Sequence, residues 1–343
     1  LWYKQMIEAM FYEKLEDKKV RCNLCPHHCL IPNFEKGICR VRENRDGVLY
    51  SLVYGKVVSY AVDPVEKKPL YHFYPGSDIF SLATVGCNFR CLHCQNYSIS
   101  QLPREQDKIE GEKLLPEQII SLTKKNNCRG IAYTYTEPTI FFEYAYQISK
   151  LARKEGIKNI FVTNGFISEE ALREIMPFMD AANVDLKAFS EKFYKKICGA
   201  SLKPILNNLK LMKKEGVWVE VTTLIIPGLN DSEEELKKIA QFILRLGEET
   251  PWHLSRFYPA YKLRDLPPTS VQILHRAREI GLKMGLRYVY TGNVPGDEGE
   301  NTYCYNCGKV LIRRYGYHLE SFNIENGKCK YCGAKIDGKG MKK

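Results

Sequence analysis

The chain has 343 residues, 44% of them hydrophobic and 27% charged, and a formal net charge of +11 at pH 7. These proportions exclude wholesale disorder, and no apolar run approaches the roughly 20 residues that cross a bilayer. The stretch from Leu1 to Lys19 lacks the apolar core of a signal peptide, so we expect a cytoplasmic protein with no membrane segment. The lysines alternate with glutamates, as from Glu233 to Lys238, which is typical of solvated helix faces; nucleic-acid binding is therefore not expected.

Thirteen cysteines are the most unusual feature of the composition. In a reducing cytosol a disulfide framework is not expected, so clustered cysteines indicate metal ligands. Eleven of the thirteen fall into three clusters, and only Cys128 and Cys198 stand apart. We interpret these two as small buried hydrophobic side chains.

The first cluster lies in an N-terminal metal-binding segment, residues 1–46, which opens with a short helix-like stretch. Its cysteines have the spacing Cys22-x2-Cys25-x3-Cys29-x9-Cys39. Four thiolates suit zinc and equally suit an Fe–S cluster, and the ferredoxin pattern with proline after the last cysteine is not matched. Of the two we favour structural zinc. A β-rich connecting segment follows at residues 47–78.

Residues 79–295 alternate apolar runs with amphipathic stretches, which predicts repeated β–α units. Strand-like runs lie at 79–85, 130–136, 159–163, 182–186, 217–226, 252–258 and 287–290. Helical patterns lie between them at 116–125, 140–155, 168–176, 203–214, 232–246 and 269–284. Such units require parallel strands with helical crossovers, so we predict an α/β fold, a partial (β/α)6 TIM-like barrel of six or seven units. The site of such a fold lies at the carboxyl ends of the strands.

The second cluster, Cys87-x3-Cys91-x2-Cys94, follows directly on the first barrel strand. Three thiolates can bind three irons of a 4Fe–4S cluster and leave the fourth iron open to another ligand. Clusters that only transfer electrons usually have four thiolates, so this spacing indicates cofactor binding. The alternative is a zinc site completed by His93.

These motifs resemble a known family. The arrangement of Cys87, Cys91 and Cys94 resembles the radical S-adenosylmethionine (SAM) superfamily, and Cys94-Gln95-Asn96 resembles its branch of pyruvate formate-lyase and other glycyl-radical activating enzymes. The stretches 22–29, 63–73 and 134–138 resemble the radical SAM enzymes of the AmmeMemoRadiSam system. The resemblance covers nearly the whole chain.

The resemblance implies a role for individual residues. Cys87, Cys91 and Cys94 would hold a 4Fe–4S cluster whose free iron chelates the methionine part of SAM. Glu137 would accept a hydrogen bond from the cofactor's amino group. Further cofactor contacts are implied for Asn164, Asp185, Lys187, Ile226 and the backbone of His93.

The sequence departs from the family pattern in two places. Tyr135 and Thr136 stand where relatives carry two glycines before the Glu-Pro pair, so the backbone approach to the cofactor can differ. Activating enzymes also place an aspartate before Thr-Asn-Gly, where it helps Asp185 hold a monovalent cation. Val162 stands there in this chain, which puts the cation site, and a strict activating-enzyme function, in doubt.

The third cluster lies in a C-terminal segment, residues 296–343, that ends in a basic tail. Cys304-x2-Cys307 and Cys329-x2-Cys332 predict the two knuckles of a zinc ribbon. Four thiolates leave no open position on the metal, so a structural role is expected. A rubredoxin-like iron is the alternative.

The expected function is radical chemistry: reductive cleavage of SAM to a 5′-deoxyadenosyl radical, which abstracts hydrogen from an unidentified substrate. The resemblance implies an electron donor such as a ferredoxin or flavodoxin, and companion proteins of the AmmeMemoRadiSam system. One hypothesis places the radical on a protein glycine, and another modifies a small molecule or macromolecule. A zinc-ribbon protein that binds nucleic acid is the alternative from a different functional class.

Overall fold

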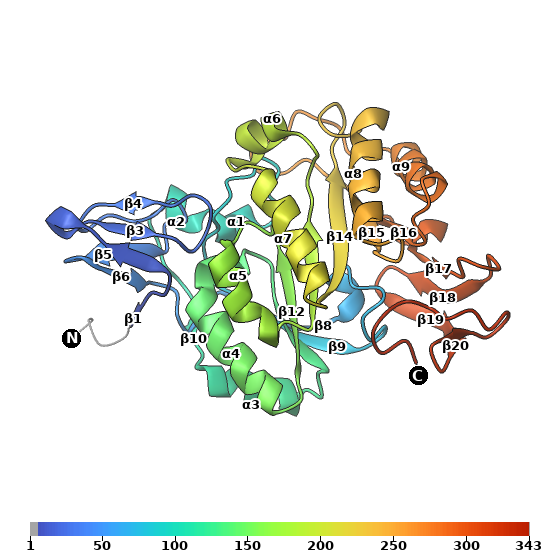
Figure 1. Cartoon of the computed structure of the whole chain (residues 1–343), viewed down its shortest axis with the longest axis horizontal. Coiled ribbons are helices and arrows are strands. Elements are labelled where there is room, and N and C mark those ends of the chain that lie inside the picture. The colour runs from blue at the N-terminus through green and yellow to red at the C-terminus, as the bar shows by residue number, and fades with distance from the viewer. Residues whose placement is uncertain (1–5, 343) are drawn as a thin grey trace.

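The fold centres on one eight-stranded sheet, seen in a computed structural model that describes residues 6–342 (Figure 1). Its order is β16-β15-β14-β13-β12-β11-β9-β8, and every neighbouring pair is parallel except β8 and β9. The strands are β8 (Ser59–Pro64), β9 (Asp78–Ala83), β11 (Gly130–Tyr133), β12 (Lys158–Thr163), β13 (Ala181–Asp185), β14 (Trp218–Ile225), β15 (Trp252–Arg256) and β16 (Val289–Gly292). The predicted α/β class and open barrel are confirmed, with seven parallel strands. Within residues 6–342 the end strands β16 and β8 do not pair, so the sheet stays open.

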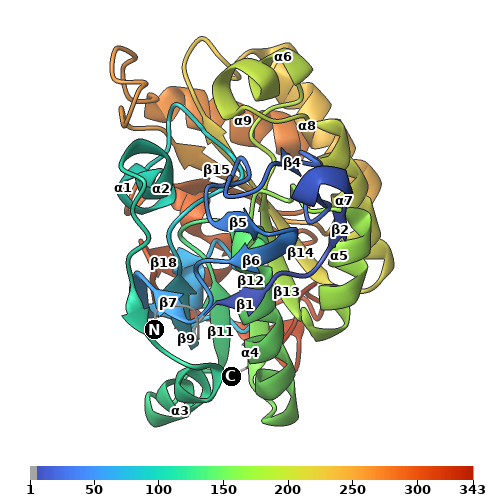
Figure 2. The same cartoon turned by 90° about the vertical axis from the view of Figure 1, so that its left-hand side faces the viewer.

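Helices connect the parallel strands and cover the outer face of the sheet (Figure 2). They are α1 (Tyr97–Ser100), α2 (Leu102–Glu105), α3 (Pro116–Lys125), α4 (Phe142–Lys154), α5 (Glu169–Ile175), α6 (Glu191–Phe193), α7 (Lys203–Lys214), α8 (Glu233–Leu246) and α9 (Val271–Lys283). Every predicted helical pattern therefore has a helix. None of the helices in the described part of the chain is long and apolar enough to cross a membrane.

Local sequence signals account for where two of these helices begin. The hydroxyl of Ser168 accepts a hydrogen bond from the backbone N–H of Ala171, and that of Ser232 accepts one from Glu235. Each bond satisfies an N–H that the helix itself cannot use. Because these caps fix the first turn, they also fix the length of the loop between each preceding strand and its helix.

The N-terminal segment is made of short strands. β1 (Ile7–Glu8) pairs with β6 (Val48–Ser51), which also pairs with β5 (Arg42–Arg45), while β2 (Tyr12–Lys14), β3 (Val20–Cys22) and β4 (Leu30–Ile31) form a second sheet. The helix-like start predicted for this region is wrong over residues 6–19, and residues 1–5 lie outside the described part. Pairing with residues far along the chain decides the outcome here, where local propensity is only a weak guide.

The C-terminal segment lies on the opposite side of the barrel from the N-terminal segment (Figure 1). It contains the sheet β17 (Thr302–Tyr303), β18 (Val310–Tyr315) and β19 (His318–Phe322), and the pair β20 (Ile324–Glu325) and β21 (Lys328–Cys329). A third pair joins β7 (Lys56–Val57) to β10 (Glu112–Lys113) beside the barrel. Leu311, Ile312, Ile324 and Ile336 form a small core of the C-terminal segment's own.

Residues 65–76, which we call the plug, fill the amino end of the barrel. The carboxylate of Glu220, near the start of β14, accepts hydrogen bonds from the backbone N–H groups of Tyr71 and His72 at 3.0 and 2.8 Å. The same carboxylate lies 2.6 Å from His253 Nε2 and is fully buried. Buried polar groups that are all hydrogen-bonded hold one arrangement rigidly. The amino end of the barrel is therefore closed by polar contacts with the plug.

Candidate metal and cofactor site at the carboxyl edge of the sheet

The three central cysteines lie on the loop that leaves β9 at the carboxyl edge of the sheet. Cys91 is buried, and Cys87 and Cys94 are partly exposed. The thiol of Cys87 accepts a hydrogen bond from the N–H of Phe89 at 3.3 Å, and Cys94 Sγ lies 3.2 Å from the hydroxyl of Ser100. Hydrogen bonds to sulfur are among the contacts that set the potential of an Fe–S cluster.

Glu137 lies at the end of the next loop along the sheet and is 1% exposed. Its Oε1 accepts from the backbone and hydroxyl of Thr139 and from the hydroxyl of Thr163, and its Oε2 accepts from the N–H of Asn164 at 2.8 Å. Burial raises the pKa of Glu137, although these hydrogen bonds oppose the rise. With one protein donor, Oε2 is the oxygen that keeps room for a cofactor amino group.

The side chain of Asn164 joins the loop after β12 to the cysteine loop. Its Nδ2 donates to Asn88 Oδ1 at 2.8 Å, and its Oδ1 accepts from the N–H of Phe166 at 2.9 Å. Asn88 in turn donates to the carbonyl of Phe166. The predicted cofactor contact at Asn164 is thus also a brace for Cys87, and Asn88, which the sequence did not single out, completes it. The only signal for Asn88 was its place inside the cysteine motif.

Asp185 and Lys187 form an ion pair of 2.7 Å at the carboxyl end of β13. Burial lowers the pKa of Lys187, but Asp185 and the nearby thiols of Cys91 and Cys198 raise it more, so the net pKa lies well above its usual value. A hydrogen bond from Cys198 and the charge of Lys187 lower the pKa of Cys91.

Cys198 is fully buried, as predicted. Its backbone also holds the cysteine loop in place. The backbone of 197–198 pairs with the cysteine loop, since the N–H groups of Arg90 and Leu92 donate to the carbonyls of Cys198 and Ile197. No spacing rule in the sequence connects Cys198 to Cys91, because the contact spans more than a hundred residues.

His93 and Ile226 lie at the same edge and are both buried. Neither ring nitrogen of His93 has a hydrogen-bond partner within the described residues, and burial lowers its pKa to about 3. The backbone N–H of Ile226 donates to Asn230 Oδ1 at 2.6 Å, and Asn230 Nδ2 donates to the carbonyl of Lys187 at 2.7 Å. Asn230, which the sequence also left unassigned, therefore links the loop after β14 to the loop after β13.

The two departures from the family pattern each have a structural counterpart. Tyr135 keeps a left-handed backbone with φ of 62°, a conformation that favours glycine and costs a residue with a side chain about 1–2 kcal/mol. Its phenol hydrogen-bonds to Asp63, next to the buried Lys68. Val162 lies on β12 and offers no ligand oxygen, while the Asp185 carboxylate already pairs with Lys187.

Comparison with known proteins agrees with this geometry. Residues 81–243 match the model of the Radical SAM superfamily. An uncharacterized protein of Methanocaldococcus jannaschii is 53% identical over 97% of this chain and 99% of its own length. The chain belongs to the radical SAM superfamily. The pyruvate formate-lyase-activating enzyme of Clostridium pasteurianum is 26% identical over 53% of this chain and 80% of its own length. The fold also matches Streptococcus suis SuiB bound to S-adenosylmethionine, with a TM-score of 0.50 at 12% identity over 67% of this chain and 53% of that one.

Membership of the radical SAM superfamily makes the protein an enzyme and implies a 4Fe–4S cluster and SAM at this edge. The residues fit both groups. Three thiols stand on one loop with no fourth cysteine of the motif, and the buried carboxylate of Glu137 has an oxygen with a single donor.

The four C-terminal cysteines form a second metal centre. Their thiols all lie within 4.8 Å of one another, with Cys304 3.7 Å from Cys332 and Cys307 3.8 Å from Cys329. Cys307 and Cys332 are exposed, whereas Cys304 and Cys329 are buried. The predicted four-cysteine site is therefore assembled, although zinc and iron are not distinguished by it.

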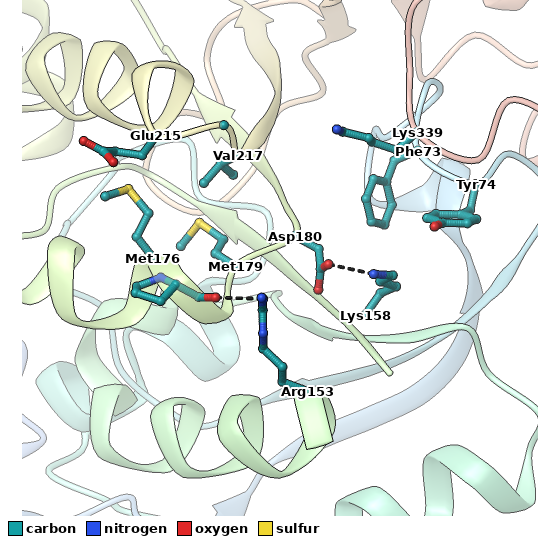
Figure 3. Close-up of a pocket in the computed structure, with 12 residues that line it drawn as sticks. Phe73, Tyr74, Arg153, Lys158, Met176, Met179, Asp180, Glu215, Val217 and Lys339 are labelled. Carbon is teal, nitrogen blue, oxygen red and sulfur yellow. Dashed lines mark hydrogen bonds and ion pairs between the residues drawn. The ribbon is translucent and has the colours of Figure 1, made fainter. Parts of the chain in front are cut away.

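A pocket of about 350 Å³ lies at the other edge of the sheet (Figure 3). It is bordered by Lys158 and Asp180, which form an ion pair of 2.9 Å at the amino ends of β12 and β13, and by Phe73 of the plug. None of the predicted cofactor residues lines it. Catalytic groups of such folds lie at the carboxyl ends of the strands, so we place no chemistry in this pocket.

Proposed function

We propose that the protein cleaves SAM reductively at a 4Fe–4S cluster held by Cys87, Cys91 and Cys94. The radical that this cleavage supplies abstracts a hydrogen atom from a substrate at the carboxyl edge of the barrel. The observation that carries the proposal is the convergence of four successive strand ends on one place. Hydrogen bonds join Asn164 after β12 to Glu137 after β11 and to Asn88 in the cysteine loop after β9, and the charge of Lys187 after β13 acts on Cys91 in that loop.

The chain's own residues bind and orient the cofactor. Glu137 Oε2 would accept from the cofactor's amino group, and Lys187, now paired with Asp185, would also bind its carboxylate. Ile226 and the backbone of His93 would lie beside the adenine. Charge-assisted contacts of this kind fix orientation as well as affinity. No side chain is required to act as a general base, because the cofactor carries the difficult chemistry.

Two features favour one class of hydrogen donor over another. Val162 and the Asp185–Lys187 pair leave no built cation site of the activating-enzyme kind, which favours modification of a small molecule or macromolecule over installation of a glycyl radical. We further propose a cytoplasmic enzyme that receives electrons from a ferredoxin or flavodoxin, and that works with companion proteins of the AmmeMemoRadiSam system. Zinc in the C-terminal site would hold β17–β21 together without taking part in the reaction.

Anaerobic incubation of the reconstituted protein with SAM and dithionite tests the proposal. We expect 5′-deoxyadenosine and methionine by chromatography, and a 4Fe–4S spectrum that changes when SAM is added. Protein that contains iron but yields neither product would overturn the proposal. Protein that contains zinc alone and binds nucleic acid would support the zinc-ribbon alternative instead.

A further inference from the structure

The N-terminal cysteines differ from the C-terminal ones in how far apart their thiols lie. Within residues 6–342, the C-terminal four are the set whose ligand atoms all fall within 4.8 Å of one another. Neither Cys22, Cys25, Cys29 and Cys39 nor the central three form such a set. Yet the N-terminal cysteines lie together, since the N–H of Cys22 donates to the carbonyl of Cys29 at 2.9 Å and the N–H of Ile38, next to Cys39, donates to Cys29 Sγ at 3.5 Å.

This difference in spacing separates two kinds of metal site. A tetrahedral zinc with Zn–S bonds of about 2.3 Å places its thiolates about 3.8 Å apart. The C-terminal contacts of 3.7 and 3.8 Å match that shell. In a 4Fe–4S cubane each thiolate binds a different iron, so the four thiolates stand further apart than those around one ion. Among the described residues, neither the N-terminal set nor the central set has the close spacing of a one-ion site, and the central set belongs to a cluster-binding family.

A buried cation faces the N-terminal set. The side chain of Arg42 is 1% exposed and donates through Nη2 to the carbonyl of Met10 and to Glu143. Its Nε and Nη1 have no hydrogen-bond partner among the described residues. Its charge interacts with Cys22, Cys39 and Cys25 after its stronger interaction with Glu143. Unpaired N–H donors beside buried thiols suit a group that brings further acceptor atoms, as the sulfides of a cubane do.

The N-terminal segment also packs directly on the central cysteine loop. A Cβ added to Gly86, the residue before Cys87, would lie 2.6 Å from a methyl of Val41 and 3.3 Å from the carbonyl of Cys39. The guanidinium of Arg104 bridges the two loops, with hydrogen bonds to the carbonyls of Ile38 at 2.8 Å and Phe89 at 3.3 Å.

A second contact joins the N-terminal segment to the central cysteine loop. His27, between Cys25 and Cys29, lies 2.8 Å through Nε2 from the carbonyl of Asn88. Thus the residues next to two of the N-terminal cysteines touch residues next to Cys87. A short, packed path therefore runs from one set of thiols to the other.

We propose that Cys22, Cys25, Cys29 and Cys39 hold a second 4Fe–4S cluster that passes single electrons to the cluster at Cys87, Cys91 and Cys94. The inference rests on the proposed function, because the electron's acceptor is the proposed cluster at Cys87, Cys91 and Cys94. A one-electron carrier of the iron–sulfur or flavin class reduces the outer cluster, which then loses that electron to the central one. No bond changes and no proton moves in this step. The outer side faces solvent, since Leu30, Phe34 and Ile38 are 55%, 65% and 43% exposed.

Metal content tests the cluster. In a variant with Cys87, Cys91 and Cys94 all changed to Ala, purified anaerobically and reconstituted, we expect about four irons and four sulfides per chain, and an Fe–S signal by electron paramagnetic resonance after reduction. A matched variant with Cys304→Ser and Cys307→Ser should lose zinc and keep all its iron. The wild type should hold about eight irons. It is measured alongside, because a variant that folds poorly could lose iron for that reason alone. Zinc in place of iron in the first variant, with about four irons in the wild type, would overturn the proposal.

Electron delivery tests the relay. In a Cys22→Ser, Cys25→Ser variant, reduction of the central cluster by reduced flavodoxin should slow at least tenfold, while SAM cleavage with dithionite persists. An unchanged rate with flavodoxin would overturn the relay. If instead the wild type cleaves no SAM but the triple alanine variant keeps its iron, the proposed function fails and the second cluster stands.

Discussion

The two edges of the parallel sheet are built from the same strands but in opposite ways. At the carboxyl edge, thiols and a carboxylate are held by a few hydrogen bonds each, and Glu137 Oε2 and both nitrogens of His93 retain free capacity. At the amino edge, Glu220 is fully used by the backbone of Tyr71 and His72, the indole of Trp218 and His253. The unused capacity at Glu137 and His93 leaves room for a ligand beside the cysteine loop, whereas the saturated carboxylate of Glu220 holds the plug in place.

The largest expected effect is at the carboxyl edge. Cys91→Ala should abolish SAM cleavage, by at least about 1,000-fold, because one iron loses its ligand and the neighbouring Lys187 loses a charge partner. Cys128→Ala, a buried cysteine before β11, is the control and should retain activity. The assay is the yield of 5′-deoxyadenosine under anaerobic conditions. Full activity in the Cys91→Ala variant would show that the cluster does not bind at this edge.

At the amino edge the effect should be on stability instead. Glu220→Gln keeps the size of the side chain but gives one position an N–H donor, which cannot accept from Tyr71 or His72. Leaving buried donors unpaired should cost about 2–4 kcal/mol of the free energy of unfolding, measured by denaturant titration. SAM affinity of the folded fraction should stay within twofold. A large loss of affinity with unchanged stability would reverse the proposed roles of the two edges.

Glu137→Gln sharpens the comparison, because it makes the same chemical change at the other edge. Loss of a charge-assisted hydrogen bond should weaken SAM binding about 10- to 30-fold, or about 1.4–2 kcal/mol. Equilibrium dialysis with the reconstituted protein measures this. The exposed Glu174→Gln on α5 is the matched control. Equal affinities in the two variants would exclude a cofactor contact at Glu137.

The smallest effect is the share of His72, at the amino edge, in the pH dependence of stability. Burial lowers the pKa of His72 from 6.5 to about 4, so this imidazole stays neutral in the fold while the unfolded chain takes up a proton near pH 6.5. The unfolded state thus binds more protons in this range, and stability falls as the pH falls. We expect a loss of about 1 kcal/mol between pH 6.5 and about pH 5.5. In His72→Gln the loss of stability over this range should shrink by this amount, while the part that comes from other buried histidines such as His93 remains. A slope unchanged from the wild type would assign the effect to another group.

Much of the barrel could be predicted from the sequence because its signals are local. Apolar runs, N-cap serines and the spacing of Cys87, Cys91 and Cys94 each depend on neighbouring residues, and the structure has the predicted strands, caps and cysteine loop. The partners Asn88, Cys198 and Asn230 could not be predicted, because each acts through a contact with a distant strand end. The same holds for the N-terminal strands, since β1 pairs with β6 across about forty residues.

Contacts across the whole chain also explain why the role of the plug was missed. Residues 63–73 carry part of the family resemblance, but their sequence does not show that His72 lies between Tyr290 of β16 and the carbonyl of Asp337. Lys68 is buried against Asp63, with its pKa lowered by burial to about 8. A local motif cannot show which end of a barrel it closes.

The bond between the plug and the C-terminal segment has a consequence for how the protein is made. The backbone of Lys339 accepts from Tyr74 and donates to the carbonyl of His72, and Asp337 binds the ring of His72. A ribosome releases the chain from its N-terminus onward, so residues 65–76 emerge long before the partners that complete their hydrogen bonds. The amino end of the barrel therefore stays unsealed until Asp337 and Lys339 have been translated. A chain cut just before Asp337 would therefore lose contacts of a segment that was synthesised about 265 residues earlier.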